Sequence, residues 1–245
     1  MFRSAAAAAA SAGSTLRVRR GWVLAAGAFP LGLLAAARAF GHGVEGDDQA
    51  FMLSHSGPLI GPYIYLGAKH MVTGYDHLLF LAGVMFFLYR LREVALYVTL
   101  FAVGHSATLL LGVLGGLHVN SYLVDAVIGL SVAYKAFENL GGFQRLGLSP
   151  DTRAAVFIFG LFHGFGLATK LQDLAISEDG LVVNMISFNV GVELGQFFAL
   201  GLILLLLNVL RASGHFFRFA GATNMVIMCA GFMLIGYQLM GYATT

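Results

Sequence analysis

Long apolar runs dominate this sequence and leave it few possible folds. A transmembrane helix needs about 20 predominantly apolar residues, and inside a bilayer only helices and closed barrels satisfy their own backbone hydrogen bonds. The chain has 245 residues, of which 58% are hydrophobic and 11% are charged, whereas soluble domains carry about 25% charged residues. We therefore predict an all-α fold, a polytopic transmembrane helix bundle. Its expected spans, six in the mature chain, are 74–90, 93–116, 120–139, 153–174, 181–210 and 216–241.

The first 39 residues have the pattern of a secretory signal segment. The basic stretch RVRR precedes the apolar stretch GWVLAAGAFPLGLLAAARAF, in which Ala37-Arg38-Ala39 is a small-x-small cleavage site. An uncleaved signal anchor is the alternative. The sequence thus divides into a signal peptide or signal anchor at 1–39, an outer N-terminal segment with room for a short helix at 40–73, and a six-helix transmembrane domain at 74–245.

Basic residues indicate which side of the membrane each loop faces. If residue 42 is outside, the inner loops fall near 90–93, 139–153 and 211–216, and each of them contains or borders arginines. The outer segments are mostly acidic. By the positive-inside rule, we expect a multi-pass protein of the bacterial inner membrane, with the mature N- and C-termini on the outer, periplasmic side. The arginines concerned are Arg90, Arg92, Arg145, Arg153 and Arg211.

The charge pattern gives no sign of a nucleic-acid partner. The formal net charge is +2, but the signal segment is rich in arginine, and acidic residues outnumber basic ones in the rest of the chain. The single cysteine, Cys229, excludes a disulfide framework and a cysteine metal site. The expected surroundings are the lipid bilayer, a metal ion and, laterally, a membrane protein complex or further copies of the chain.

Several polar side chains lie within the predicted spans, where they are costly and count by default as site candidates. His105, His163 and Glu193 lie near the middle of the second, fourth and fifth spans. Asn189 and Gln196 share a helix face with Glu193, because the three residues stand at i, i+4 and i+7. The alternative is that these groups only form hydrogen bonds between helices.

Pairs of glycines surround two of these residues, His163 and Glu193. Each pair has the small-xxx-small spacing that lets membrane helices approach closely. If the fourth and fifth spans pack together there, His163 and Glu193 face each other near the middle of the membrane. The glycines are Gly160, Gly164, Gly191 and Gly195.

The stretch LGAKHMVTGYDHLLFL places a further candidate site at the start of the first span. His70 and His77 would share a face of a continuous helix, but roughly 10 Å apart at 1.5 Å per residue. A bend at Gly74, with Thr73 or Asp76 capping the new helix, would bring them together. Two imidazoles and a carboxylate suit Ni, Co, Zn, Cu(II) or Fe(II) rather than Mg or Ca. Alternatively, Asp76 is only a helix cap and the histidines are interfacial.

Taken by depth, the candidates form a series from the outer face to the middle of the membrane. The motif of the first span stands at the outer lip, and the mid-span residues stand below it. This order predicts a path for a cation. The secondary candidates along the path are His42, His55, Asn189, Gln196, Asp125 and Glu138.

At these residues the sequence resembles the HupE/UreJ family, the hydrogenase/urease accessory membrane proteins. The resemblance rests on HMVTGYDHLLFL, FAVGHSATL, FGLFHGFGLA and SFNVGVELGQ, and it extends from about His42 to Tyr242. It implies a six-helix mature protein after a signal peptide. It also implies a permease or carrier for a divalent transition metal, nickel or cobalt first and otherwise copper or zinc, that serves metalloenzyme maturation.

Carried over by motif, the resemblance implies that His70, Asp76 and His77 form the first family motif and that His163 lies in the second. The family pattern closes its second motif with a glutamate, where this chain reads Ala168-Thr169-Lys170. We therefore expect Glu193 to supply the carboxylate beside His163.

Two other functions fit the same residues. One is a non-catalytic or metal-delivering subunit, or an assembly factor, of a membrane complex. The other is an intramembrane zinc hydrolase, in which Asp76, Ser106 and the buried histidines would hold Zn²⁺ and an activated water. The sequence has no G-x-S-x-G nucleophile elbow, and we expect the protein not to be an enzyme.

Overall fold

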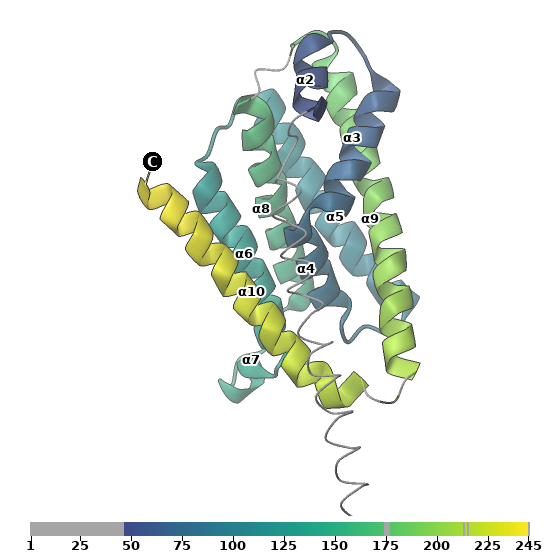
Figure 1. Ribbon diagram of the computed structural model, residues 1–245, viewed down its shortest axis with the longest axis vertical. Coiled ribbons are helices and arrows are strands. Elements are labelled where there is room, and N and C mark those ends of the chain that lie inside the picture. The colour runs from purple at the N-terminus through teal and green to yellow at the C-terminus, as the bar shows by residue number, and fades with distance from the viewer. Residues whose placement is uncertain (1–46, 174–176, 213, 215, 245) are drawn as a thin grey trace, which may run out of the picture.

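The computed structural model describes residues 47–173, 177–212, 214 and 216–244, and the regular structure in these ranges is entirely helical (Figure 1). The predicted all-α class is confirmed for this part of the chain. The predicted signal segment, its cleavage site and His42 lie outside the described residues. The helices are α2 (Asp47–Ser54), α3 (Ile60–Thr73), α4 (Tyr75–Met85), α5 (Leu91–Gly115), α6 (Ser121–Asn139), α7 (Gly142–Arg145), α8 (Thr152–Asp173), α9 (Leu181–Ala212) and α10 (Phe216–Thr244).

Four of these helices, α5, α8, α9 and α10, are long and apolar enough to cross a membrane. Helix α6 has 19 residues but contains three charged ones, Asp125, Lys135 and Glu138. The first predicted span, 74–90, is not a single helix, because α4 has 11 residues and ends at Met85. At 1.5 Å per residue α4 is roughly 16 Å long, which is about half the thickness of the hydrocarbon core.

Helices α3 and α4 follow one another along the bundle and are separated by a break at Gly74 (Figure 1). The Gly74 backbone is extended, with φ −69° and ψ 99°. Its N–H donates to the His70 carbonyl over 2.9 Å, and its carbonyl accepts from the Leu78 N–H over 3.1 Å. The break is the bend that the sequence predicts. The cap residue of α4 is Gly74 rather than Thr73 or Asp76, although Asp76 Oδ1 accepts from the His77 backbone N–H over 2.9 Å within the first turn.

Glycines allow the long helices to approach one another in three close pairs. A Cβ atom added to Gly160 of α8 would lie 2.6 Å from the Phe101 carbonyl oxygen in α5. A Cβ atom on Gly195 of α9 would lie 2.6 Å from the Ala68 carbonyl oxygen in α3, and one on Gly231 of α10 would lie 2.6 Å from the backbone of α6. These positions have no room for a side chain, so the backbones of each pair are in contact, as small residues permit in membrane proteins.

The three pairs contradict the predicted packing of the fourth span against the fifth. The glycines around His163 face α5, whereas the glycines around Glu193 face α3. The prediction that His163 and Glu193 face each other is therefore wrong. The sequence spacing correctly marks which helix faces pack closely, but it does not reveal which helix each face meets.

The two ends of the bundle differ in charge. Successive long helices run in opposite directions from α5 to α10. The end of α4 and the start of α5 lie at the same end of the bundle as α7 (Figure 1). All arginines of the described residues lie at or near this end, and the opposite end, beside α2, is mostly acidic. The arginines are Arg90, Arg92, Arg145, Arg153, Arg211 and Arg218; the acidic residues at the opposite end are Asp47, Asp48, Asp173, Glu178 and Asp179.

Replacing Gly191 by alanine is expected to destabilise the fold, because the added methyl group would overlap the Ile64 carbonyl and push α9 away from α3. Overpacking of this kind costs about 1–3 kcal/mol. Gly201→Ala is the matched control on the same helix, since nothing lies within 4 Å of its Cβ position. SDS titration of the purified proteins in detergent measures both. Equal stability of the two variants would contradict the close contact between α3 and α9.

Candidate metal site

Four buried histidines from four helices meet beside the break at Gly74. His70 lies near the end of α3, His77 in the first turn of α4, His105 within α5 and His163 within α8. His77 is the central member: its ring centroid lies 4.9 Å from that of His163, 5.2 Å from that of His70 and 5.9 Å from that of His105. In chain order their exposed fractions are 9%, 3%, 0% and 1%. An ion held here is therefore withdrawn from both lipid and bulk water.

Three of these side chains are close enough to share one ion. A ring nitrogen from each of His70, His77 and His105 lies within 4.8 Å of the other two. Around a tetrahedral ion with bonds of about 2.1 Å, ligand nitrogens stand roughly 3.4 Å apart, so small side-chain shifts would close the group on an ion. Imidazole donors suit Ni, Co, Cu, Zn and Fe(II), whereas Mg and Ca prefer oxygen.

The hydrogen bonds of His77 and His163 leave one ring nitrogen of each for a metal ion. His77 Nδ1 donates to Asp76 Oδ1 over 2.9 Å, and His163 Nδ1 donates to the Phe159 carbonyl over 2.7 Å. Because these oxygens accept, each Nδ1 carries the proton of the neutral ring and each Nε2 keeps its lone pair. Both Nε2 atoms are buried and have no hydrogen-bond partner among the described residues. Metal-binding histidines are usually held in this way.

Aromatic rings enclose the cluster on the side away from the break. Phe101 and Phe80 lie against His163, with ring centroids 5.0 Å and 5.5 Å away, and Phe101 also stacks on His105. Neither ring nitrogen of His105 bonds to another described residue. A buried polar group without a partner costs roughly 1–3 kcal/mol. An ion would satisfy His105 where the surrounding phenylalanines cannot.

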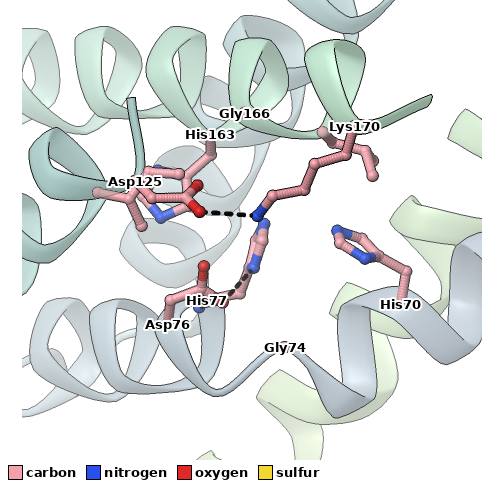
Figure 2. Close-up of a pocket in the computed structure, with 10 residues that line it drawn as sticks. His70, Gly74, Asp76, His77, Asp125, His163, Gly166 and Lys170 are labelled. Atoms are coloured by element: carbon pink, nitrogen blue, oxygen red, sulfur yellow. Dashed lines mark hydrogen bonds and ion pairs between the residues drawn. The ribbon is translucent and has the colours of Figure 1, made fainter. Parts of the chain in front are cut away.

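A cavity of about 20 Å³ opens between the α3–α4 break and helices α6 and α8 (Figure 2). This volume exceeds the roughly 10–15 Å³ that one water needs, so the cavity has room for an ion or a water. Lys170 reaches across it and pairs with Asp125, with 2.8 Å between Nζ and Oδ2 (Figure 2). The lining residues are His70, Gly74, Asp76, His77, Asp125, Ile128, His163, Gly166, Leu167 and Lys170.

Asp125 is a secondary candidate from the sequence, whereas Lys170 is a residue of the cavity that the sequence did not identify. Lys170 follows His163 by seven residues, so both lie on one face of α8. That spacing is the signal that could have identified it. The ion pair with Asp125 depends on the packing of α8 against α6, which the sequence does not reveal.

Helix α9 contributes less to the site than predicted. Asn189 and Gln196 are buried, and Gln196 Nε2 donates to a backbone carbonyl of α5 over 3.4 Å. Glu193 lies between them in sequence but is exposed on the outer face of α9, and it is not among the residues that line the cavity. The carboxylates that the structure places at the cavity are Asp76 and Asp125.

The remaining candidates lie away from the cluster. His55 is exposed in the segment after α2, and Glu138, near the opposite end of the bundle, pairs with Lys135 over 2.7 Å. The predicted series from outer lip to midplane is therefore wrong in its first part. His70 and His77, expected at the lip, join the two mid-span histidines in one cluster.

A bundle of membrane-length helices around a buried histidine cluster defines a class, the polytopic membrane proteins with a candidate transition-metal site. A family model described as HupE / UreJ protein matches residues 46–245, and the chain belongs to this family. The family is associated with accessory roles for hydrogenase and urease, and its members are generally considered transporters or accessory proteins rather than enzymes. No curated protein and no solved structure matches the chain.

Asp76→Asn is expected to weaken Co²⁺ or Ni²⁺ binding to the purified protein about 10- to 100-fold, as loss of the partner of a metal-bound histidine typically does. The amide oxygen can still accept from His77 Nδ1, but it lacks the charge that strengthens the imidazole as a donor. Asp173→Asn is the matched control, because Asp173 pairs with His118 over 2.9 Å at an exposed position. Equilibrium dialysis with metal analysis by mass spectrometry measures both variants. An equal loss in the two would rule out the role assigned to Asp76.

Proposed function

We propose that the protein is a membrane permease or carrier for a divalent transition metal ion, which serves the maturation of metalloenzymes. The observation that carries the proposal is the histidine cluster, where His77 and His163 present Nε2 atoms oriented by hydrogen bonds. Nitrogen donors favour Ni, Co, Cu and Zn over Mg and Ca. The association of the family with hydrogenase and urease favours nickel, with cobalt as the next candidate.

The broken α3–α4 segment supports transport. In many transporters the ion site lies near the bilayer midplane where discontinuous helices meet, and the C-terminal ends of half-helices help to hold the cation. Here α3 ends and α4 begins at Gly74, which lines the cavity. The partial negative charge at the C-terminus of α3 is thus directed at the ion. We propose that α3 and α4 together form one span and that α5, α6, α8, α9 and α10 form the other five.

The proposed orientation in the bacterial inner membrane follows from the charges at the two ends. The end that carries the arginines faces the cytoplasm by the positive-inside rule, and the α2 end and the C-terminus of α10 face the periplasm. The ion then sheds its water on reaching the cluster from the α2 end. His77 is the first ligand we assign to it, because its ring contacts those of the other three histidines.

A second candidate function is delivery of metal within a larger membrane complex. The observation in its favour is Glu193, which is exposed on the longest helix, α9, in the middle of an apolar face. An ionised acidic side chain at the centre of a membrane helix costs on the order of 3 kcal/mol, and a polar group on a neighbouring protein would offset this cost. Such a partner could receive the ion.

The transport proposal predicts that cells expressing the chain accumulate nickel or cobalt and that the double variant His77→Ala, His163→Ala does not. Loss of two buried ligands removes the site, whereas His118→Ala removes an exposed histidine outside the cavity and serves as the control. The measurement is the cellular content of Ni, Co, Cu, Zn and Fe by mass spectrometry, at matched abundance of each variant in the membrane.

The outcomes separate the candidate functions. A rise in one metal that needs both histidines supports transport and identifies the ion. No rise in any metal, together with co-purification of an oxidoreductase, would favour metal delivery. If no metal accumulates in the cells and no partner co-purifies, but the purified protein holds one tightly bound Zn²⁺ per chain, the result would favour the hydrolase hypothesis.

A further inference from the structure

The cavity beside the histidines already contains a cation, the ammonium group of Lys170. Its Nζ lies 2.8 Å from Asp125 Oδ2, and the two side chains are 26% and 10% exposed. Gln238 Nε2 of α10 donates to the same oxygen over 3.3 Å. The ion pair therefore links α8 and α6 across the cavity (Figure 2), and the bond from Gln238 connects the same carboxylate to α10.

The second oxygen of Asp125 lies apart from the ion pair. Asp125 Oδ1 is buried and has no hydrogen bond to any described residue. The neighbouring residue Gly166 leaves the oxygen open, because a Cβ atom there would lie 3.3 Å from it. Both Asp125 and Gly166 line the cavity that His77 and His163 also line. A carboxylate oxygen in this position is a further donor for a cation.

Lys170 and a divalent ion compete for this carboxylate. Two cations in one small cavity repel each other strongly, because the protein interior screens charge less than water does. A lysine ammonium is a compact charge on a flexible four-carbon stem, so it can withdraw while the backbone of α8 stays in place. Lys170 lies seven residues beyond His163, roughly 10 Å nearer to the α2 end of the bundle, and it can move in that direction.

We propose that Lys170 is a tethered cation that exchanges with the transported ion at Asp125. In the absence of an ion, the ammonium neutralises Asp125 and closes the cavity on the side of the α2 end. An ion arriving at the histidines takes Asp125 as an additional ligand and displaces the ammonium. When the ammonium returns, it competes with the ion for Asp125 and so favours release. This inference rests on the proposed function, since it requires that the histidine cluster binds a divalent metal.

A second lysine that pairs with a carboxylate provides a control. Lys135 pairs with Glu138 over 2.7 Å and so has the same chemistry, and its side chain is 10% exposed, against 26% for that of Lys170. It does not line the cavity. Removal of the Lys135 charge tests what the loss of any buried lysine–carboxylate pair does to the protein.

The first test is Co²⁺ binding by the purified full-length protein in lipid nanodiscs, measured by equilibrium dialysis. Lys170→Met is expected to tighten binding about 10-fold or more, because a like charge is removed from the cavity. Asp125→Asn is expected to weaken it about 10-fold or more, the double variant should fall between the two, and Lys170→Arg should resemble the wild type. Lys135→Met should leave binding unchanged. Unchanged or weaker binding by folded Lys170→Met would overturn the proposal.

The second test needs no variant of the ion pair. An amine-reactive reagent is applied to the wild-type protein with and without Co²⁺, and labelling is mapped by mass spectrometry. The lysines of the chain are Lys69, Lys135 and Lys170. Labelling of Lys170 should rise several-fold with Co²⁺, while that of exposed Lys69 should not change. Constant labelling of Lys170 in protein that binds Co²⁺ would contradict the exchange.

His77→Ala distinguishes a failure of the histidine site from a failure of the exchange at Asp125. If this variant binds Co²⁺ as the wild type does, the histidine site itself fails, and the exchange at Asp125 falls with it. If the variant loses Co²⁺ binding but Lys170→Met and the labelling of Lys170 show no effect, the proposed function stands and only the exchange is wrong.

Discussion

An unbroken helix from Ile60 to Met85 would hold His70 and His77 two turns apart, at roughly 10 Å, which is too far for one ion. The extended backbone at Gly74 removes this limit and brings the two ring centroids to 5.2 Å. The rest of the site depends on the same break, because it lets α4 present His77 to the histidines of α5 and α8. The backbone path at Gly74 therefore determines whether these histidines can meet.

Close contact between α5 and α8 then positions the other donors. Lipid tails are as apolar as leucine, so membrane helices associate through packing and hydrogen bonds rather than through the hydrophobic effect. Gly104, Gly160 and Gly164 supply that packing here, and a side chain at Gly164 would overlap the His105 carbonyl. The same contact that joins the helices thus places His105 and His163 at neighbouring positions around His77.

The sequence predicts individual helices far better than it predicts their contacts. Helices α5, α6, α8, α9 and α10 begin and end within a turn of the predicted spans, because span length and hydrophobicity are local properties. The errors concern neighbours. The helical period shows which residues share a face with Glu193, but not which helix that face contacts. In the structure the Glu193 side chain is exposed. Lys170 pairs with Asp125 on another helix, a contact that no local pattern in the sequence predicts.

The candidate donors are divided among the three glycine-mediated helix pairs, α3 with α9, α5 with α8 and α6 with α10. His70 belongs to the first pair, His105 and His163 to the second, and Asp125 to the third, while α4 lies between them. Backbone contacts within a pair resist deformation, whereas side-chain contacts between pairs permit sliding. A shear of one pair past another would therefore open or close the ligand shell without unfolding any helix.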